Sequence, residues 1–154
     1  MDSVAMDYLV EQQCSRQWKG LLRALAAELA QDLAPERLRA AMARAGGRFA
    51  RSRELPPCRT LEELQFAMGR IWVDIDWGWV ELAEQPQALR IRHHCAPIAT
   101  AFGAEALPWS AGFLEGAYDA WFRHLHAGAA LAVRQVAAPD AKDVFEFHLA
   151  QAAA

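Results

Sequence analysis

The stretch that decides the fold reads Pro108-Trp109-Ser110-Ala111-Gly112-Phe113-Leu114-Glu115-Gly116-Ala117-Tyr118-Asp119-Ala120-Trp121. Proline suits the first turn of a helix, so this stretch predicts a helix from Pro108 to about His126. Gly112, Gly116 and Ala120 recur every four residues, which leaves one side of that helix almost bare. Each glycine inside a helix costs roughly 1 kcal/mol relative to alanine, so close approach by another backbone should offset the cost. That backbone is expected to be a sheet or a second copy of the same helix.

Length and composition indicate a single folded domain without a membrane span. The 154 residues are enough for a real core, and a hydrophobic content of 54 % excludes general disorder. No apolar run reaches the roughly 18 residues that a spanning helix needs. Residues 1–7 lack the basic and apolar regions of a signal peptide. We therefore expect a cytoplasmic protein, which the three irregularly spaced cysteines also suit.

The charged residues are distributed unevenly along the chain. Residues 16–59 contain ten basic and four acidic residues, whereas residues 60–154 contain six basic and twelve acidic ones. Such opposed halves could steer copies of the chain together or attract an acidic partner to the first half. The alternative is that both halves are ordinary solvated surfaces.

The first part of the chain predicts three helices behind a short arm. Residues 1–14 show no clear period and are expected to form an extended or weakly helical arm, followed by one domain over residues 15–150. Thr60 and Glu63 form a capping box at the start of the third helix, and Gly46-Gly47 is expected to interrupt the second. Apolar residues three and four apart mark the helices: Trp18-Leu22-Leu25-Leu29, Leu38-Met42-Ala45-Phe49 and Leu61-Leu64-Met68-Ile71-Ile75.

Two strands are expected before the glycine-striped helix and two after it, because apolar and polar residues alternate with a period of two in those segments. Residues 77–82 and 88–93 alternate on either side of a turn at residues 84–87, which predicts a hairpin. Residues 96–107 read as a loop, and two further strands are expected at residues 131–134 and 145–149. The order, three helices and then ββαββ, predicts an α+β fold with an antiparallel sheet packed against helices.

The sequence predicts no catalytic, metal or cofactor site. It contains no phosphate-binding glycine loop and no nucleophile elbow. His93-His94-Cys95 is the most tempting cluster, but neighbouring strand residues point to opposite faces and could not share a metal ion without a bulge. A pI near 5.9 and the lack of a base-reading module speak against nucleic-acid binding by the arginine-rich second helix.

The aromatic residues of the first hairpin are candidates for contact with a partner. Trp77 and Trp79 are expected on the strand face opposite Val80 and Leu82. If the chain leaves that face uncovered, both indoles could bind another protein or stack on a sugar polymer. Alternatively, one or both pack beneath the first helices. The candidate contact residues are Trp77, Trp79, Gly112, Gly116, Ala120 and Trp121.

Two of these stretches resemble a known family. The strand Asp76-Trp77-Gly78-Trp79-Val80 and the helix Leu114-Glu115-Gly116-Ala117-Tyr118-Asp119-Ala120-Trp121 are similar to those of the cellulose synthase operon D proteins of bacteria. The resemblance extends over roughly residues 18–149. It implies a non-catalytic accessory subunit that forms an octamer, as a tetramer of dimers, and promotes ordered, crystalline cellulose synthesis and export. Implied partners are the synthase complex, a proline-rich scaffold protein and a glucan chain.

The same helix also loosely resembles one in the 4-vinyl reductase and vesicle-tethering adaptor superfamily. That resemblance implies the alternative of a sensor domain that holds a small apolar ligand or cofactor. Such a function needs a pocket lined by residues such as Phe113, Trp121 and Phe147.

Overall fold

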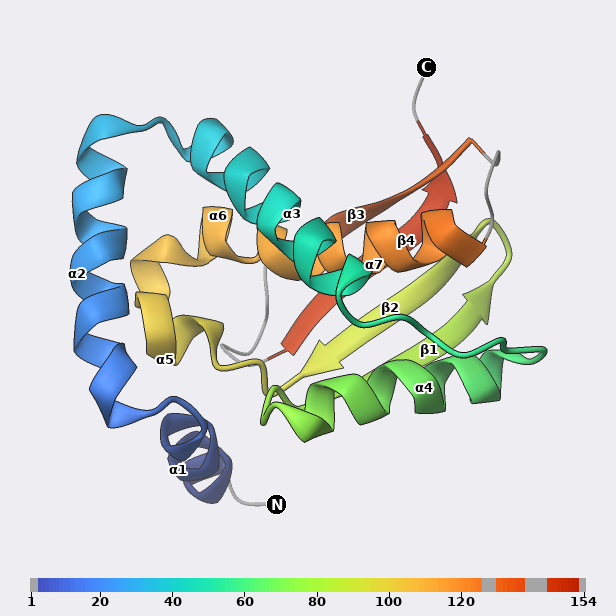
Figure 1. The fold of residues 1–154 in the computed structure, drawn as a ribbon, viewed down its shortest axis with the longest axis horizontal. Coiled ribbons are helices and arrows are strands. Elements are labelled where there is room, and N and C mark those ends of the chain that lie inside the picture. Colours follow the sequence, from blue (N-terminus) through green and yellow to red (C-terminus); the bar gives the residue numbers. More distant parts are fainter. Residues whose placement is uncertain (1–2, 126–129, 138–143, 153–154) are drawn as a thin grey trace.

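The computed structural model describes residues 3–125, 130–137 and 144–152. It confirms the predicted α+β class, with helices first and an antiparallel sheet after them (Figure 1). The helices and strands are α1 (Ser3–Gln13), α2 (Arg16–Asp32), α3 (Pro35–Arg51), α4 (Leu61–Asp74), β1 (Trp79–Gln85), β2 (Ala88–His94), α5 (Ile98–Phe102), the 3₁₀ turn η1 (Ala104–Ala106), α6 (Leu107–Ser110), α7 (Gly112–Leu125), β3 (Leu131–Ala137) and β4 (Val144–Gln151).

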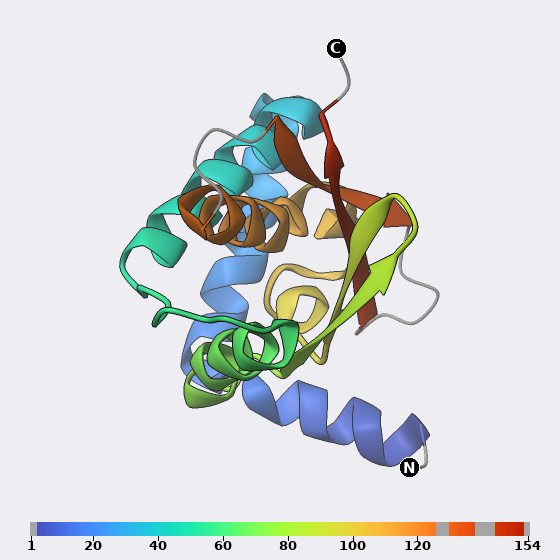
Figure 2. The same cartoon turned by 90° about the vertical axis from the view of Figure 1, so that its right-hand side faces the viewer.

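The four strands pair in the order β1-β2-β4-β3, and each neighbouring pair is antiparallel. The first hairpin places Leu82 opposite Ile91, and β2 then places Ile91 opposite Phe147 of β4. These three side chains are buried, so the alternation predicted for the strands is confirmed. Figure 2 shows the helices gathered on one side of the sheet and its other face uncovered.

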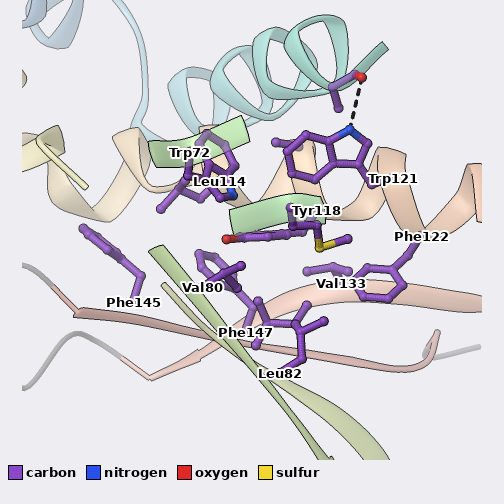
Figure 3. Close-up of a cluster of buried hydrophobic side chains, with 14 of the residues drawn as sticks. Trp72, Val80, Leu82, Leu114, Tyr118, Trp121, Phe122, Val133, Phe145 and Phe147 are labelled. Carbon is purple, nitrogen blue, oxygen red and sulfur yellow. Dashed lines mark hydrogen bonds between the residues drawn. The ribbon is translucent and has the colours of Figure 1, made fainter. Parts of the chain in front are cut away.

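The core fills the space between that sheet, α4 and α7. Trp72 and Tyr118 are fully buried, with their ring centroids 5.8 Å apart. Tyr118 also packs on Phe147 of the sheet, with centroids 5.8 Å apart. Figure 3 shows these aromatic side chains interleaved with Leu114 and Val80 from both layers. Aromatic pairs at such distances contribute beyond their apolar area, so this cluster anchors the helices on the sheet.

Three local predictions need correction. Residues 96–107 are not a loop but contain α5 and η1, where Ile98 and Ala101 are buried although the small residues show no clear period. Residues 3–13 form a regular helix, where an extended or weakly helical arm was predicted. Gly46-Gly47 does not interrupt α3, which runs from Pro35 to Arg51 because both glycines lie against a neighbouring helix. The predicted end of the last helix at His126 lies outside the described residues.

The start of α4 follows the predicted capping box in part. The Glu63 N–H donates to the Thr60 hydroxyl oxygen at 3.1 Å, as predicted. The Glu63 carboxylate accepts instead from the backbone N–H of Arg59, at 2.6 Å. The Thr60 half of the capping box is therefore present, whereas the Glu63 carboxylate binds the N–H one residue before the N-cap instead of that of Thr60.

Candidate functional site

The bare stripe of α7 lies against α3 of the same chain. A Cβ added to Gly116 would lie 1.9 Å from the Ala43 carbonyl oxygen, and one added to Gly112 would lie 2.7 Å from that of Arg39. The contact is reciprocal, because a Cβ on Gly46 of α3 would lie 1.9 Å from the Phe113 carbonyl oxygen. The close approach that the glycines predicted is thus present. The backbone that packs against the bare stripe is that of α3, and not that of a sheet or of a second copy of the helix.

Ala120 and Trp121, two other candidate contact residues on α7, also lie on the side of the helix that faces α3. Ala120 lies beside Gly47, whose added Cβ would be 3.9 Å from the Ala120 methyl carbon. The Trp121 indole is buried in the aromatic cluster of Figure 3, and its N–H donates to the carbonyl oxygens of Ala50 and Arg53, at 3.1 Å and 3.0 Å. Carbonyl groups at a helix C-terminus lack partners within the helix, so Trp121 satisfies the end of α3.

The expectation that Trp77 and Trp79 share a strand face was wrong. Two residues of the preceding turn have positive φ, Asp76 at 59° and Gly78 at 77°, and β1 begins only at Trp79. A side chain on Gly78 would meet the His94 carbonyl oxygen at 1.8 Å. Because this turn reorients the backbone, Trp77 points inward and stacks on Trp72, with centroids 5.9 Å apart.

Trp79 remains on the uncovered face of the sheet, where 41 % of its surface is exposed. Its indole lies parallel to the imidazole of His94, with centroids 5.1 Å apart and planes within 6°. The His94 Nε2 atom lies 3.2 Å from the Glu81 carboxylate. Glu146 continues this polar surface across the sheet, 3.6 Å from the Arg92 guanidinium. The arrangement presents one indole beside planar polar groups, which suits contact with a protein or a sugar chain.

The His93-His94-Cys95 cluster divides between two faces, as the strand argument predicted. His93 is fully buried and its Nε2 lies 2.7 Å from the Trp77 carbonyl oxygen, which can only accept. Nε2 therefore carries the hydrogen, and Nδ1 accepts from the Tyr118 hydroxyl group at 2.6 Å. Burial lowers the pKa of His93 to about 3 and raises the pKa of Tyr118 well above its usual value. Both ring nitrogens are thus occupied within the core.

The described part of the chain offers no cluster of three His, Cys, Asp or Glu side chains placed to hold a metal ion. The pocket needed by the sensor alternative is filled. Phe147 is fully buried, and Phe113 packs on Phe49 and Trp77, with centroids 5.6 Å and 5.1 Å away. A groove of about 440 Å³ lies elsewhere, between α2 and the α5–α6 segment, above Trp109.

Sequence reasoning missed the role of two carboxylates on α7. Asp119 accepts from the backbone N–H of Val133 at 2.9 Å, and Glu115 accepts from that of Gln135 at 2.8 Å. Both N–H groups belong to β3, an edge strand of the sheet. Glu115 and Asp119 are four residues apart, so they lie on one side of the helix and about 6 Å apart along its axis. Alternate residues of a strand, such as Val133 and Gln135, are separated by a similar length. Edge strands are prone to pair with other chains, so these carboxylates protect one edge of the sheet.

Removing one of these acceptors should destabilise the protein. We expect Asp119→Ala to lower the free energy of unfolding by about 1.5–3 kcal/mol, because the Val133 N–H loses a charged acceptor. Urea unfolding measures the change. Asp119→Asn is the control, since its amide oxygen can still accept the same hydrogen bond. An unchanged urea midpoint for Asp119→Ala would show that water replaces the carboxylate without cost.

Two helices expose large apolar side chains, and among them Trp18, Leu25 and Leu29 belong to the apolar stripe that the sequence predicted for the first helix. We define the α2 face as Trp18, Leu21, Leu25 and Leu29, and the α4 face as Phe66, Gly69 and Val73. Trp18 and Leu21 are 53 % and 55 % exposed, and Phe66 is 70 % exposed. The helical period in the sequence identified an apolar side of α2, but it could not show that α5 packs on a different side.

Helix α1 adds to this exposed apolar surface. Its side chains Val4, Tyr8 and Leu9 are at least half exposed. The helix has 11 residues, and isolated helices of that length are marginal in water. Its contacts with the rest of the chain include a Met6 sulfur atom 3.3 Å from the Cys95 thiol and an ion pair between Glu11 and Lys19. The apolar side chains of α1 therefore remain available for contact with another surface.

These features describe an α+β domain that exposes large apolar side chains on α1, α2 and α4 and one indole on its sheet. The chain belongs to the family of the cellulose synthase D subunit, whose model matches residues 4–148. A cellulose synthase operon protein D of Komagataeibacter xylinus is 36 % identical over 103 residues, which cover 65 % of this chain and 65 % of that protein. The protein of the same name from Komagataeibacter sucrofermentans matches to the same extent. Another from K. xylinus is 38 % identical over 68 residues, or 43 % of this chain and 44 % of the relative.

Among the described residues, no helix combines the length and the apolar character needed to cross a membrane.

Proposed function

We propose that this chain is a non-catalytic accessory and scaffold subunit of a bacterial cellulose synthase complex in the cytoplasm. In this role it assembles into an octamer, as a tetramer of dimers, and promotes ordered, crystalline cellulose synthesis and export. Membership of the cellulose synthase D family supports the link to cellulose. The observation that carries the scaffold role is the large apolar surface exposed on α2 and α4.

The physical argument for assembly is the cost of leaving that surface in water. Burial of apolar surface contributes roughly 25 cal/mol per Å², and large contiguous apolar patches on a protein surface mark interaction sites. Trp18, Leu21, Leu25 and Leu29 form one stripe along α2. Trp79 adds a separate candidate contact for a proline-rich protein or a glucan chain, since its indole is exposed beside planar polar side chains.

Two measurements test the proposal. The mass of the purified protein, measured by light scattering after size exclusion, should approach eight times the 17.1 kDa of one chain. Deletion of the gene in a cellulose-producing host should reduce the crystallinity of the cellulose, and the wild-type gene should restore it. A protein that remains at 17.1 kDa, together with cellulose of unchanged yield and crystallinity after deletion, would refute the proposed function.

The role of Trp79 is tested separately. Trp79→Ala should retain the wild-type mass and melting temperature, because the side chain is exposed. In the deletion host, however, the cellulose made with this variant should have a lower crystallinity than the cellulose made with the wild-type protein. The matched control is Val136→Ala, which removes another exposed apolar side chain of the sheet. Equal restoration by Trp79→Ala and the wild type would remove Trp79 from the candidate contacts.

A further inference from the structure

We infer that a row of arginine side chains on α3 of one copy of the chain docks in an acidic groove between α4 and β1 of the next copy. This inference rests on the proposed self-assembly and specifies how two copies meet. The contact joins two different surfaces, so each copy offers one of each. A contact of this kind builds a ring if the rotation between copies closes.

The arginines lie on the side of α3 that faces away from its own chain. We define the arginine row as four exposed residues of this helix, Arg37, Arg44, Arg48 and Arg51. Because each helical residue turns by about 100°, their spacing places all four within about 60° around the axis. Gly46, which meets the backbone of α7, lies on the opposite side of the helix. Figure 2 shows α7 between α3 and the sheet, so the arginine row borders solvent.

The positive charge of the arginine row is not neutralised within the described part of the chain, where none of the four arginines forms an ion pair. Arg44 and Arg48 are four residues apart, and Arg51 follows three residues later, spacings at which like charges on a helix repel. The row extends over about 21 Å, at a rise of about 1.5 Å per residue. An acidic protein surface laid along it would remove the repulsion, whereas one small anion could not cover its length.

A groove of about 420 Å³ between α4 and the end of β1 offers such a surface. It is lined by Leu61, Glu62, Gln65, Leu82, Ala83 and Glu84. Both glutamates are exposed, and within the described ranges neither forms an ion pair. An arginine packs its aliphatic stem on apolar surface and pairs its planar guanidinium with carboxylates. The two leucines can contact such a stem, and the two glutamates can hold its guanidinium group.

The distribution of charge selects this groove over the others. The groove above Trp109 contains Arg23, and a smaller one beside Trp121 contains Arg51. Each would bring a positive charge against the arginine row, whereas the described lining of the α4–β1 groove includes no basic residue. Two arginine rows would repel each other for the same reason, so the contact joins unlike surfaces.

The positions of the two surfaces permit repeated use of this contact. In Figure 1, α3 lies in the upper part of the molecule and α4 runs along its lower margin. A second copy bound at one surface therefore leaves the other free. A third copy can then use the same pair of surfaces, which extends the assembly beyond a dimer.

Charge reversal tests the inference. Arg44→Glu with Arg48→Glu makes the row acidic, and Glu62→Arg with Glu84→Arg makes the groove basic. Each double variant brings like charges together, so light scattering at about 0.1 M salt, where the screening length is about 10 Å, should show a smaller assembly than the wild type. All four side chains are exposed, so both variants should keep the wild-type circular dichroism spectrum. Glu105→Arg, which reverses an exposed carboxylate outside both surfaces, should keep the wild-type mass.

The decisive sample carries all four reversals. Its net charge is again −3, because the two pairs of changes cancel, and its acidic row again faces a basic groove. It should therefore recover the wild-type mass, and a folded fourfold variant that stays as small as the double variants would overturn the pairing. A reduced mass for only one double variant would also overturn it, because the row or the groove would then meet a different surface. Wild-type mass for both double variants would overturn it while leaving self-assembly intact. A wild-type protein of 17.1 kDa would instead refute self-assembly itself.

Discussion

Gly116→Ala is expected to destabilise the protein by about 3 kcal/mol or more, at or above the top of the usual range for overpacking. The added Cβ would lie 1.9 Å from the Ala43 carbonyl oxygen and 2.6 Å from the Ala43 Cα atom. These are backbone atoms, so no side chain can rotate away, and α3 and α7 would have to separate. Displacing a whole helix pair disturbs more contacts than repacking one side chain does. Chemical denaturation followed by circular dichroism measures the loss.

The matched control is Gly20→Ala in α2. Gly20 also lies within a helix, but no atom beyond its two neighbours and the surrounding turns of the helix backbone comes within 4 Å of its added Cβ. Alanine should therefore stabilise the protein there by about 0.5–1 kcal/mol, through helix propensity alone. If Gly116→Ala were as stable as the wild type, the helices could not be packed as closely as the structure shows.

Acid should destabilise the wild-type protein through His93. The pKa of this imidazole falls from 6.5 to about 3 on folding because the side chain is fully buried. Between these values the unfolded chain binds a proton that the folded chain does not, so stability decreases as the pH falls. The slope approaches about 1.4 kcal/mol per pH unit, which amounts to about 2 kcal/mol at pH 5 and about 4 kcal/mol at pH 3. Above pH 6.5 this contribution to stability is fully present.

A variant without the titrating group isolates this effect. His93→Gln can still form hydrogen bonds but cannot take up a proton in this range. Its stability should be lower at neutral pH, because the geometry of the bonds to Tyr118 and Trp77 changes, and it should fall less steeply between about pH 7 and 5 than that of the wild type. His124→Gln, on the exposed end of α7, should retain the wild-type slope. Parallel pH profiles for the wild type and His93→Gln would contradict the buried, neutral histidine.

The elements that could be predicted are those whose burial follows a simple period. The strand residues Leu82, Ile91 and Phe147 alternate with polar neighbours, and the structure buries all three. The segment at residues 96–107 could not be predicted in this way. Its small residues show no clear period, and Ile98, Thr100 and Ala101 of α5 are buried where α2 packs against this helix.

For the candidate contact residues too, the local pattern predicted one part and tertiary packing decided the rest. Gly112 and Gly116 indicated a close backbone contact, but helix period alone could not name α3 as the partner. Trp77 was placed on the wrong side because its orientation depends on the positive φ of Asp76 and Gly78. The exposure of the α2 face was missed for a related reason. A stripe of leucines has the same pattern whether its own chain or another one covers it.

The sequence by itself determined the class of the fold, the four strands, the main helices and the family, because these depend on local periods and short motifs. The tertiary structure alone decided which surfaces meet. It placed α3 in the bare stripe of α7, Glu115 and Asp119 on the edge of β3, and the α2 and α4 faces in solvent. The physical reason is that the period of a helix or strand determines the side on which each of its side chains lies. Which element packs against that side depends on how the whole chain folds.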